Sequence, residues 1–162
     1  MTTNSSPAPV LLAVNGTLMR GLELNPNLLA VGGTFLHEAR TAPVYRLWSI
    51  NDSHPAMVRV KSGGAAVELE IWAVPPDGLA ALLLSEPPGL SIGKVKLADG
   101  SEVLGILGEP VLCENQAEIT RYGGWRGYVQ GKQGAKSKIQ NPNINVHEPP
   151  RRRAARHAAD AG

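Results

Sequence analysis

The amino-acid sequence predicts an α+β domain in which a curled or barrel-like mixed β-sheet is accompanied by a few short helices. Two observations predict this fold class. Short runs of apolar and β-branched residues recur along most of the chain, separated by Gly or Pro. The segments with a helical pattern are few and short. With 162 residues, of which 43% are hydrophobic, the chain is long enough for one domain with a buried core.

The predicted strands begin at the first apolar run and continue to about residue 130. In the segment 65–74, apolar residues alternate with Glu68 and Glu70, so we expect one face of this strand to be buried and the other to face solvent. Two turn signals, Ser62-Gly63-Gly64 and Asp99-Gly100, predict hairpins. The predicted strands are 10–14, 33–39, 44–49, 56–61, 65–74, 92–96, 102–113 and part of 125–129.

Two short helices are predicted. One follows Pro75-Pro76-Asp77-Gly78 and covers 79–84, with Asp77 as its N-terminal cap. Pro87-Pro88 must end this helix, because proline cannot continue a helix. A second helix is expected at 115–122.

Composition divides the chain into three parts. Residues 1–9 are small and polar and are expected to be disordered, whereas 10–130 forms the domain. From 131 to 162 we expect a basic, flexible tail that cannot build a core. This tail holds seven Lys or Arg against two acidic residues, a balance of +5, while 1–130 holds nine against twelve, a balance of −3. The arginines of the tail lack interleaved aromatics, which predicts weak electrostatic attraction and no specific nucleic-acid binding.

Cysteine content and hydropathy exclude several classes of protein. Cys113 is the single cysteine, so neither an intrachain disulfide nor a multi-cysteine metal site can form, and we expect it to be buried and inert in a strand. No His, Cys or carboxylate pair has metal-ligand spacing, and we expect neither a metal nor another cofactor. No run approaches the roughly 20 apolar residues that cross a bilayer, and no signal peptide is visible. The sequence therefore predicts a cytoplasmic protein without a membrane partner.

The stretch Val14-Asn15-Gly16-Thr17-Leu18-Met19-Arg20-Gly21 directly follows the apolar run 10–14. Asn-Gly is a hairpin signal, but the residues that follow cannot continue as a ladder strand. We therefore expect the first strand to end in a loop whose backbone N–H groups are free, and such a concavity binds anions. Gly16 would let the main chain approach a ligand and take a positive φ, and Thr17 could add a hydroxyl. An ordinary turn or helix start is the alternative.

This loop resembles the Tyr-Gly-Ser/Thr-Leu loop that opens the gamma-glutamylcyclotransferase-like fold. Further stretches are similar to the C-terminal domain of allophanate hydrolase, and the likeness covers about residues 10–130. The resemblance implies that Asn15, Gly16, Thr17 and Leu18 bind a carboxylate or amide carbonyl of a small metabolite. Asn15 stands where many cyclotransferases have Tyr, which alters the pocket wall. The stretches that carry the resemblance are 35–47, 87–93, 97–101 and 123–126.

A catalytic carboxylate is the second candidate feature. Cyclotransferases of this superfamily use one glutamate, in a Leu-Asp-x-x-Glu-Gly motif, as general base. The segment 82–87 places Glu86 at that position but lacks the Asp and the Gly, so a solvent-exposed residue at a helix end is the alternative. Tyr45 and Arg46 could also reach a ligand carboxylate, but neighbours on a strand point to opposite faces, so at most one faces the pocket.

Three functions remain open. The first is a stand-alone relative of the allophanate hydrolase C-terminal domain that binds a small carboxylate or carbamate and assists its decarboxylation in urea- or allophanate-type nitrogen metabolism. The second is a gamma-glutamyl-amine cyclotransferase that uses Glu86 as its base. The third is a non-catalytic assembly partner of a separate amidase, and a homo-oligomer also remains open. Nothing before Val10 has room for the amidase domain of allophanate hydrolase, so we expect no hydrolase with its own nucleophile.

Overall fold

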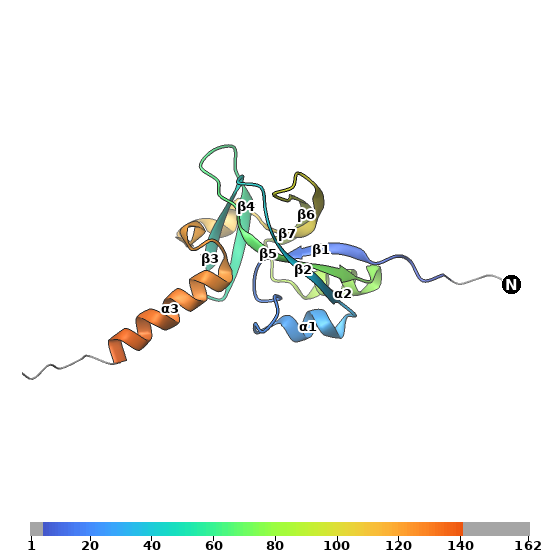
Figure 1. Cartoon of the computed structure of the whole chain (residues 1–162), viewed down its shortest axis with the longest axis horizontal. Coiled ribbons are helices and arrows are strands. Elements are labelled where there is room, and N and C mark those ends of the chain that lie inside the picture. The colour runs from blue at the N-terminus through green and yellow to red at the C-terminus, as the bar shows by residue number, and fades with distance from the viewer. Residues whose placement is uncertain (1–4, 141–162) are drawn as a thin grey trace, which may run out of the picture.

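The computed structural model describes residues 5–140 of the chain as two β-sheets with three α-helices and two short 3-10 helices. Figure 1 shows helix α3 extending away from the sheets, on the side opposite to the described N-terminal segment. In chain order the elements are β1 (Val10–Val14), α1 (Asn25–Ala30), β2 (Thr34–Arg40), β3 (Tyr45–Ile50), β4 (His54–Arg59), β5 (Glu68–Val74), α2 (Pro76–Ser85), β6 (Leu90–Lys96), β7 (Glu102–Gly108), η1 (Pro110–Cys113), β8 (Ala117–Glu118), η2 (Thr120–Tyr122) and α3 (Trp125–Gln140).

The larger sheet contains five strands in the order β2-β5-β1-β7-β6. Strand β1 pairs with β5 in antiparallel register, Val10 opposite Val74, and with β7 in parallel, Leu12 opposite Leu104. The predicted hairpin at Asp99-Gly100 is confirmed, because it joins the antiparallel strands β6 and β7. Gly100 has φ +87°, a conformation that glycine adopts without strain.

The smaller sheet is antiparallel, in the order β4-β3-β8. The strands therefore form two sheets rather than the single curled or barrel-like sheet expected from the sequence. The predicted hairpin at Ser62-Gly63-Gly64 is also wrong, because the strands on its two sides belong to different sheets. Strand β4 pairs with β3, whereas β5 pairs with β1 and β2. The two sheets approach closely where β4 meets β7: a Cβ built on Gly108 would lie 2.6 Å from the Cβ of Ala56.

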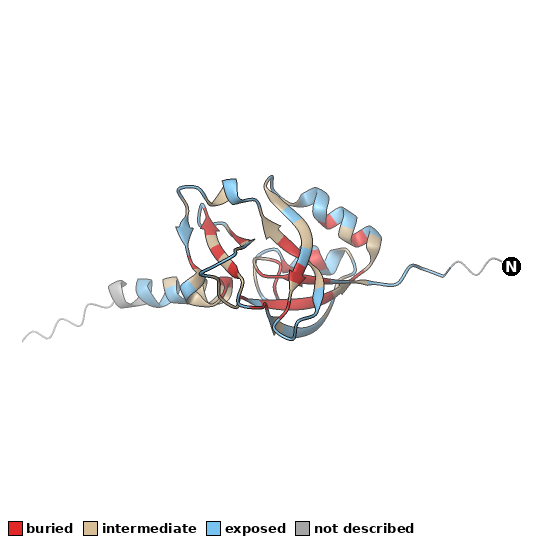
Figure 2. Cartoon of the chain, turned by 90° about the horizontal axis from the view of Figure 1, so that it is seen from above, coloured by how far each residue is buried: buried red, intermediate tan, exposed pale blue. Residues whose placement is uncertain are grey.

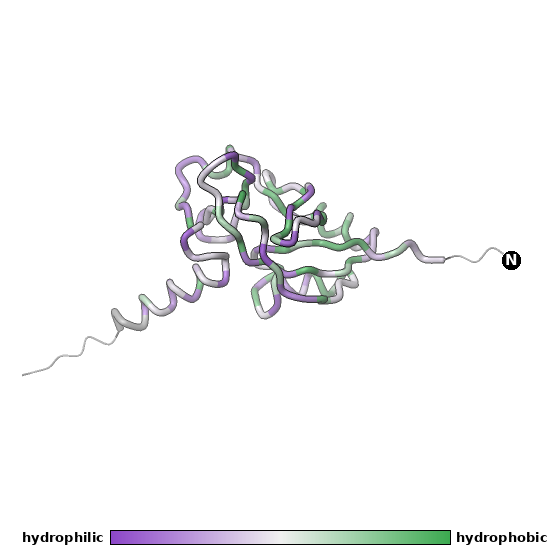
Figure 3. Tube along the Cα trace, turned by 45° about the horizontal axis from the view of Figure 1, so that its top comes forward, coloured by the Kyte–Doolittle hydropathy of each residue, from purple (hydrophilic) through white to green (hydrophobic). Residues whose placement is uncertain are grey.

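The core lies between the strands and combines many aliphatic side chains with a few aromatic ones. Trp72 and Tyr45 are its largest fully buried side chains. Figure 2 shows the buried residues concentrated on the strands, and Figure 3 shows that the hydrophobic residues follow the same segments, whereas most of α3 is hydrophilic. The other fully buried side chains of large volume are Leu12, Leu28, Leu47, Met57, Leu69, Ile71, Leu82, Ile119, Val14 and Val67.

Strand β5 differs from the alternating pattern that its sequence suggests. Glu68 is exposed as predicted, but Glu70 is only 2% exposed, so the expected solvent-facing side is wrong at this residue. The Glu70 carboxylate is stabilised in the interior by the indole of Trp72 and by Arg20 and Arg126, two residues far away in sequence. A buried charge is tolerated only with such partners, which the pattern of β5 alone does not reveal.

The helices follow the sequence expectations in part. Helix α2 ends at Ser85, before the predicted proline stop, but Asp77 lies in its first turn and makes no capping hydrogen bond. The helix expected at 115–122 is wrong: β8 and η2 occupy most of this segment. Cys113 lies in η1 rather than in a strand and is partly exposed, and partial burial raises the pKa of its thiol.

Helix α3 contradicts the expected strand at 125–129 and continues into the segment that was expected to be a tail. The predicted strand at 125–129 is its first part, and its second part continues past residue 130, where a flexible tail was expected to begin. Trp125 is buried and starts the helix, while Tyr128 packs edge-on against Tyr122. Aromatic packing therefore supports a helix despite its glycine-rich sequence. The rest of the expected tail, 141–162, lies outside the described residues. Among the described helices, none combines the length and apolarity that crossing a membrane requires.

Candidate functional site

In the loop after β1, the carbonyl groups already accept hydrogen bonds, whereas the N–H groups lack described acceptors. The carbonyl oxygens of Gly16 and Thr17 accept hydrogen bonds from the amides of Met19 and Leu24, at 3.0 and 2.9 Å. The carbonyl of Leu18 accepts from the side chain of the buried Asn25, at 2.9 Å. In contrast, the N–H groups of Gly16, Thr17 and Leu18 donate to no acceptor within residues 5–140. The loop is therefore electropositive towards any group in front of it.

Gly16 is required by crowding rather than by its backbone angle. It is not among the residues with positive φ, so that part of the expectation is wrong. A Cβ at this position would lie 2.7 Å from Cγ and Cδ of Pro55, a distance that real side chains do not tolerate. The loop therefore packs directly on the start of β4, which lies in the other sheet.

A pocket of about 310 Å³ opens in front of the loop and brings together residues from both sheets and from the end of α2. Five of the six predicted site residues line this pocket: Asn15, Gly16, Thr17, Leu18 and Glu86. The remaining lining residues are Val14, Leu24, Ile50, Asn51, Ser53, His54, Pro55, Pro87, Leu90 and Ile106.

Glu86 reaches this pocket because of the proline that follows it. A residue before proline is restricted to extended backbone, and Glu86 has φ −68° and ψ 145° directly after the last helical residue. Partial burial raises the pKa of the Glu86 carboxyl, while the nearby His54 acts in the opposite direction when it is charged. A carboxyl with a raised pKa can exchange a proton closer to neutral pH than an exposed glutamate.

Tyr45 and Arg46 do not belong to the pocket, although Tyr45 was predicted to bind substrate. Tyr45 is fully buried in the core, and its hydroxyl accepts a hydrogen bond from the amide of Lys96 at 2.9 Å. Arg46 points to the opposite face, where its Nε donates to the carbonyl of Gly63 and pairs with Glu118. Both side chains therefore connect parts of the fold.

Asn15 is held firmly in the pocket wall. Asn15 is only 4% exposed. Its Nδ2 donates to the carbonyl oxygen of Ile106 at 3.0 Å and to the sulfur of Met57 at 3.6 Å. Because a carbonyl oxygen only accepts, the Nδ2 end of the amide must face Ile106. The orientation of Asn15 is thus fixed by β7.

His54 and Asn25 are the main features that the sequence did not reveal. His54 begins β4 and lines the pocket. Asn25 supports the loop from seven residues further along the chain. No local signal distinguishes these residues, since each acquires its place through packing between distant segments.

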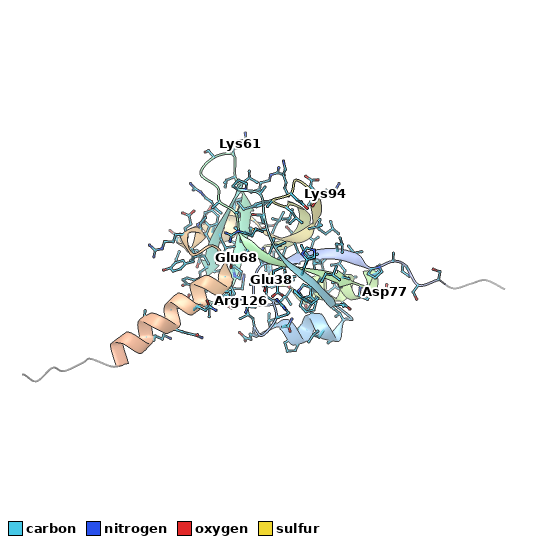
Figure 4. All side chains as sticks on the ribbon, viewed as in Figure 1. Glu38, Lys61, Glu68, Asp77, Lys94 and Arg126 are labelled. Carbon is cyan, nitrogen blue, oxygen red and sulfur yellow. The ribbon has the colours of Figure 1, made fainter. Side chains whose placement is uncertain are left out.

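A second hollow, of about 500 Å³, is lined by residues of β2, β5 and the start of α3, together with Met19 and Ala98. Figure 4 labels Glu38, Glu68 and Arg126, which line it and lie near one another. Its charges already have partners: Arg40 pairs with Glu68 and Arg20 pairs with Glu38. Within the described part of the chain, no three His, Cys, Asp or Glu residues are grouped so that they could hold a metal ion.

Comparison with known proteins shows which family this chain resembles. The model of the family described as the allophanate hydrolase C-terminal domain matches residues 10–130. The urea amidolyase of Saccharomyces cerevisiae is 31% identical over 138 residues, which is 79% of this chain. The chain spans only 8% of the length of that curated relative.

Solved structures show the same similarity. A uropathogenic E. coli-specific protein has a TM-score of 0.73 and 64% identity, over 75% of this chain and 95% of that one. An allophanate hydrolase of Kluyveromyces lactis has a TM-score of 0.74 and 30% identity, over 77% of this chain and 22% of that one. An aig2-like protein of Mus musculus has a TM-score of 0.54 and 18% identity, over 70% of this chain and 88% of that one, a likeness that shows the gamma-glutamylcyclotransferase-like fold alone.

Proposed function

The chain belongs to the allophanate hydrolase C-terminal domain family, and on that premise we propose that its pocket binds a small carboxylate- or carbamate-type metabolite. The observation that carries this proposal is the composition of one pocket. Gly16, Thr17 and Leu18, whose N–H groups have no described acceptor, line the same pocket as Glu86, and this supports the proposal. The N–H groups would bind the carboxylate of the metabolite, and Glu86 would exchange a proton with it.

This arrangement suits the decarboxylation of an N-carboxylated compound. Protonated Glu86 would donate its proton to the carbamate nitrogen, the C–N bond would break with its electron pair moving to nitrogen, and CO₂ would leave. The loop amides would hold an oxygen of the carboxylate beforehand and so orient the carbamate nitrogen towards Glu86, because a positioned reactant needs no further ordering before it reacts. The raised pKa of Glu86 supports this role, since a larger fraction of the acid is then protonated.

Stopped-flow measurement of CO₂ release from freshly dissolved carbamate tests the proposed reaction. We expect the full chain to accelerate the release, and Glu86→Gln to remove most of the acceleration, by roughly 10²-fold or more. Glu102→Gln is the matched control, because Glu102 is exposed at the start of β7 and outside the pocket. An equal rate with and without the protein would reject decarboxylation of carbamate.

A cyclotransferase reaction is the second candidate, favoured by the same placement of Glu86. Ionised Glu86 would take a proton from the α-amine of a gamma-glutamyl amine. The amine would attack the gamma-carbonyl, the amide C–N bond would break, and the proton would leave with the departing amine, releasing 5-oxoproline. Mass-spectrometric detection of 5-oxoproline, formed by the wild-type chain and not by Glu86→Gln, would support this reaction. A chain that neither binds nor converts these compounds would fit the third expectation, an assembly partner of a separate amidase.

A further inference from the structure

The amide of Asn15 leaves one polar atom unused. Its Nδ2 is committed to Ile106 and Met57, which fixes where its Oδ1 lies. No N–H or O–H group of the described residues donates to that Oδ1. Yet no fully occluded side-chain oxygen or nitrogen in the described part of the chain lacks a partner. The Oδ1 atom is therefore reached by solvent although Asn15 as a whole is 96% buried, and Asn15 lines the loop pocket.

Asn15, whose Oδ1 is not fully occluded, thus lines the same pocket as the three residues with free donors and precedes them directly in the chain. Asn15 contributes an acceptor oxygen, and the next three residues, Gly16, Thr17 and Leu18, contribute N–H groups without described acceptors. A simple carboxylate satisfies the donors but leaves the acceptor without a partner. A molecule that carries an N–H close to its carboxylate satisfies both, because the N–H can donate to Oδ1 while the carboxylate accepts from the loop.

We propose that Asn15 determines the ligand specificity of this pocket by accepting a hydrogen bond from a ligand N–H, so that the preferred ligands are carboxylates with an adjacent amide or carbamate N–H. This inference rests on the proposed carboxylate-binding function and narrows its ligand class. Discrimination of this kind is strong in general, because a ligand without the N–H leaves a desolvated acceptor unpaired.

Oxamate and pyruvate are the probes that separate the two contributions. They have the same shape and both are anions at neutral pH, but oxamate has an NH₂ group where pyruvate has a methyl group. Calorimetric titration of the full chain should give a dissociation constant about tenfold lower for oxamate than for pyruvate. Amide NMR shifts of Gly16, Thr17 and Leu18 during both titrations would locate the carboxylate at the loop.

The outcomes distinguish this inference from the function on which it rests. Equal affinities for the two probes, with loop shifts for both, would reject the role of Asn15 and leave carboxylate binding intact. Absence of binding by both probes would reject the carboxylate site and the inference together. Because these outcomes use the wild-type chain, they do not depend on whether any variant folds.

A pair of variants adds a second readout. Asn15→Leu removes Oδ1 at nearly constant volume, and we expect the preference for oxamate to fall to about onefold while pyruvate binding changes by less than about threefold. Asn27→Leu is the matched control, because Asn27 is exposed on α1 and outside the pocket. A folded Asn15→Leu chain that keeps the full preference for oxamate would also overturn the inference.

Discussion

Arg20 binds Glu70 through both its main chain and its side chain. The Arg20 amide donates to Oε2 of Glu70 at 3.0 Å, and its Nε donates to Oε1 at 3.1 Å. The same carboxylate accepts hydrogen bonds from the indole of Trp72 and from Nη2 of Arg126, and the latter group also donates to the carbonyl of Arg20. One buried charge thus connects β5, the chain just after the loop at 15–18, and the start of α3.

Replacing Glu70 should therefore destabilise the protein strongly. We expect Glu70→Gln to lower the free energy of unfolding by about 3 kcal/mol, because it leaves two arginines without their buried partner. Glu68→Gln, which removes an exposed partner of Arg40 on the same strand, should lower it by less than about 1 kcal/mol. Urea denaturation of the two variants measures this difference, and similar losses in both would contradict the assigned role of Glu70.

Glu86 should make stability depend on pH in a direction that is unusual for a carboxylate. Burial raises its pKa in the folded protein, so folding favours the protonated form. Its contribution to stability is therefore fully present below the unfolded pKa and is lost as the pH rises through the folded pKa. Relative to wild type, Glu86→Gln should become more stable as the pH increases from about 4 towards 7. Thermal unfolding across this range tests the trend, with Glu102→Gln as the control that should show no such gain.

The contact between the two sheets should tolerate no extra atom at Gly108. A Cβ there would lie 2.6 Å from the Cβ of Ala56, so Gly108→Ala should lower the free energy of unfolding by about 1–3 kcal/mol. Gly134→Ala is an opposite case, because nothing lies within 4 Å of the position of its Cβ on the exposed side of α3. It should stabilise the helix by up to about 1 kcal/mol. Chemical denaturation would contradict the close packing of the sheets if both variants changed stability alike.

Asp52 should titrate at unusually low pH. Hydrogen bonds from Lys132 and Tyr128 lower the pKa of the Asp52 carboxyl from 3.8 to about 2. The stabilising effect is present above the unfolded pKa and is lost as the pH falls from about 4 towards 2. NMR titration should place the Asp52 midpoint near 2 in wild type and closer to 3.8 in Lys132→Gln. The difference should shrink at high salt, because both side chains are partly exposed; an unchanged midpoint in the variant would contradict the contact.

Much of the sheet could be predicted from the sequence because strand signals are local. The run 10–14 coincides with β1, and the Asp99-Gly100 turn lies between β6 and β7. The resemblance also indicated the loop and Glu86, which the structure places in one pocket. The errors occur where distant partners decide the outcome. Glu70 depends on Arg126, which lies 56 residues away. The division into two sheets depends on strand pairing, which alternation within a strand does not specify.

Helix α3 is a further case in which packing, and not the local sequence, decides the structure. Its glycines and polar residues predict little helix, but Trp125 and Tyr128 pack against the body of the fold. Most helical stability in proteins comes from such packing rather than from intrinsic propensity. The place of His54 in the pocket could not be predicted for a related reason. It depends on the packing of β4 against the loop, where Gly16 lies close to Pro55. Neither contact has a signature in the neighbouring sequence.

The course of α3 beyond residue 130 matters for anyone who designs a fragment or a fusion of this protein. Tyr128 and Lys132 both donate hydrogen bonds to Asp52, and the adjacent Asn51 lines the pocket. A truncation after Gln130 would cut inside the helix and remove Lys132, and with it one of the contacts that hold Asp52 in the turn at 51–53. A boundary chosen at the edge of the matched family region would therefore remove a contact that holds the turn beside the pocket, although it deletes no residue that lines the pocket.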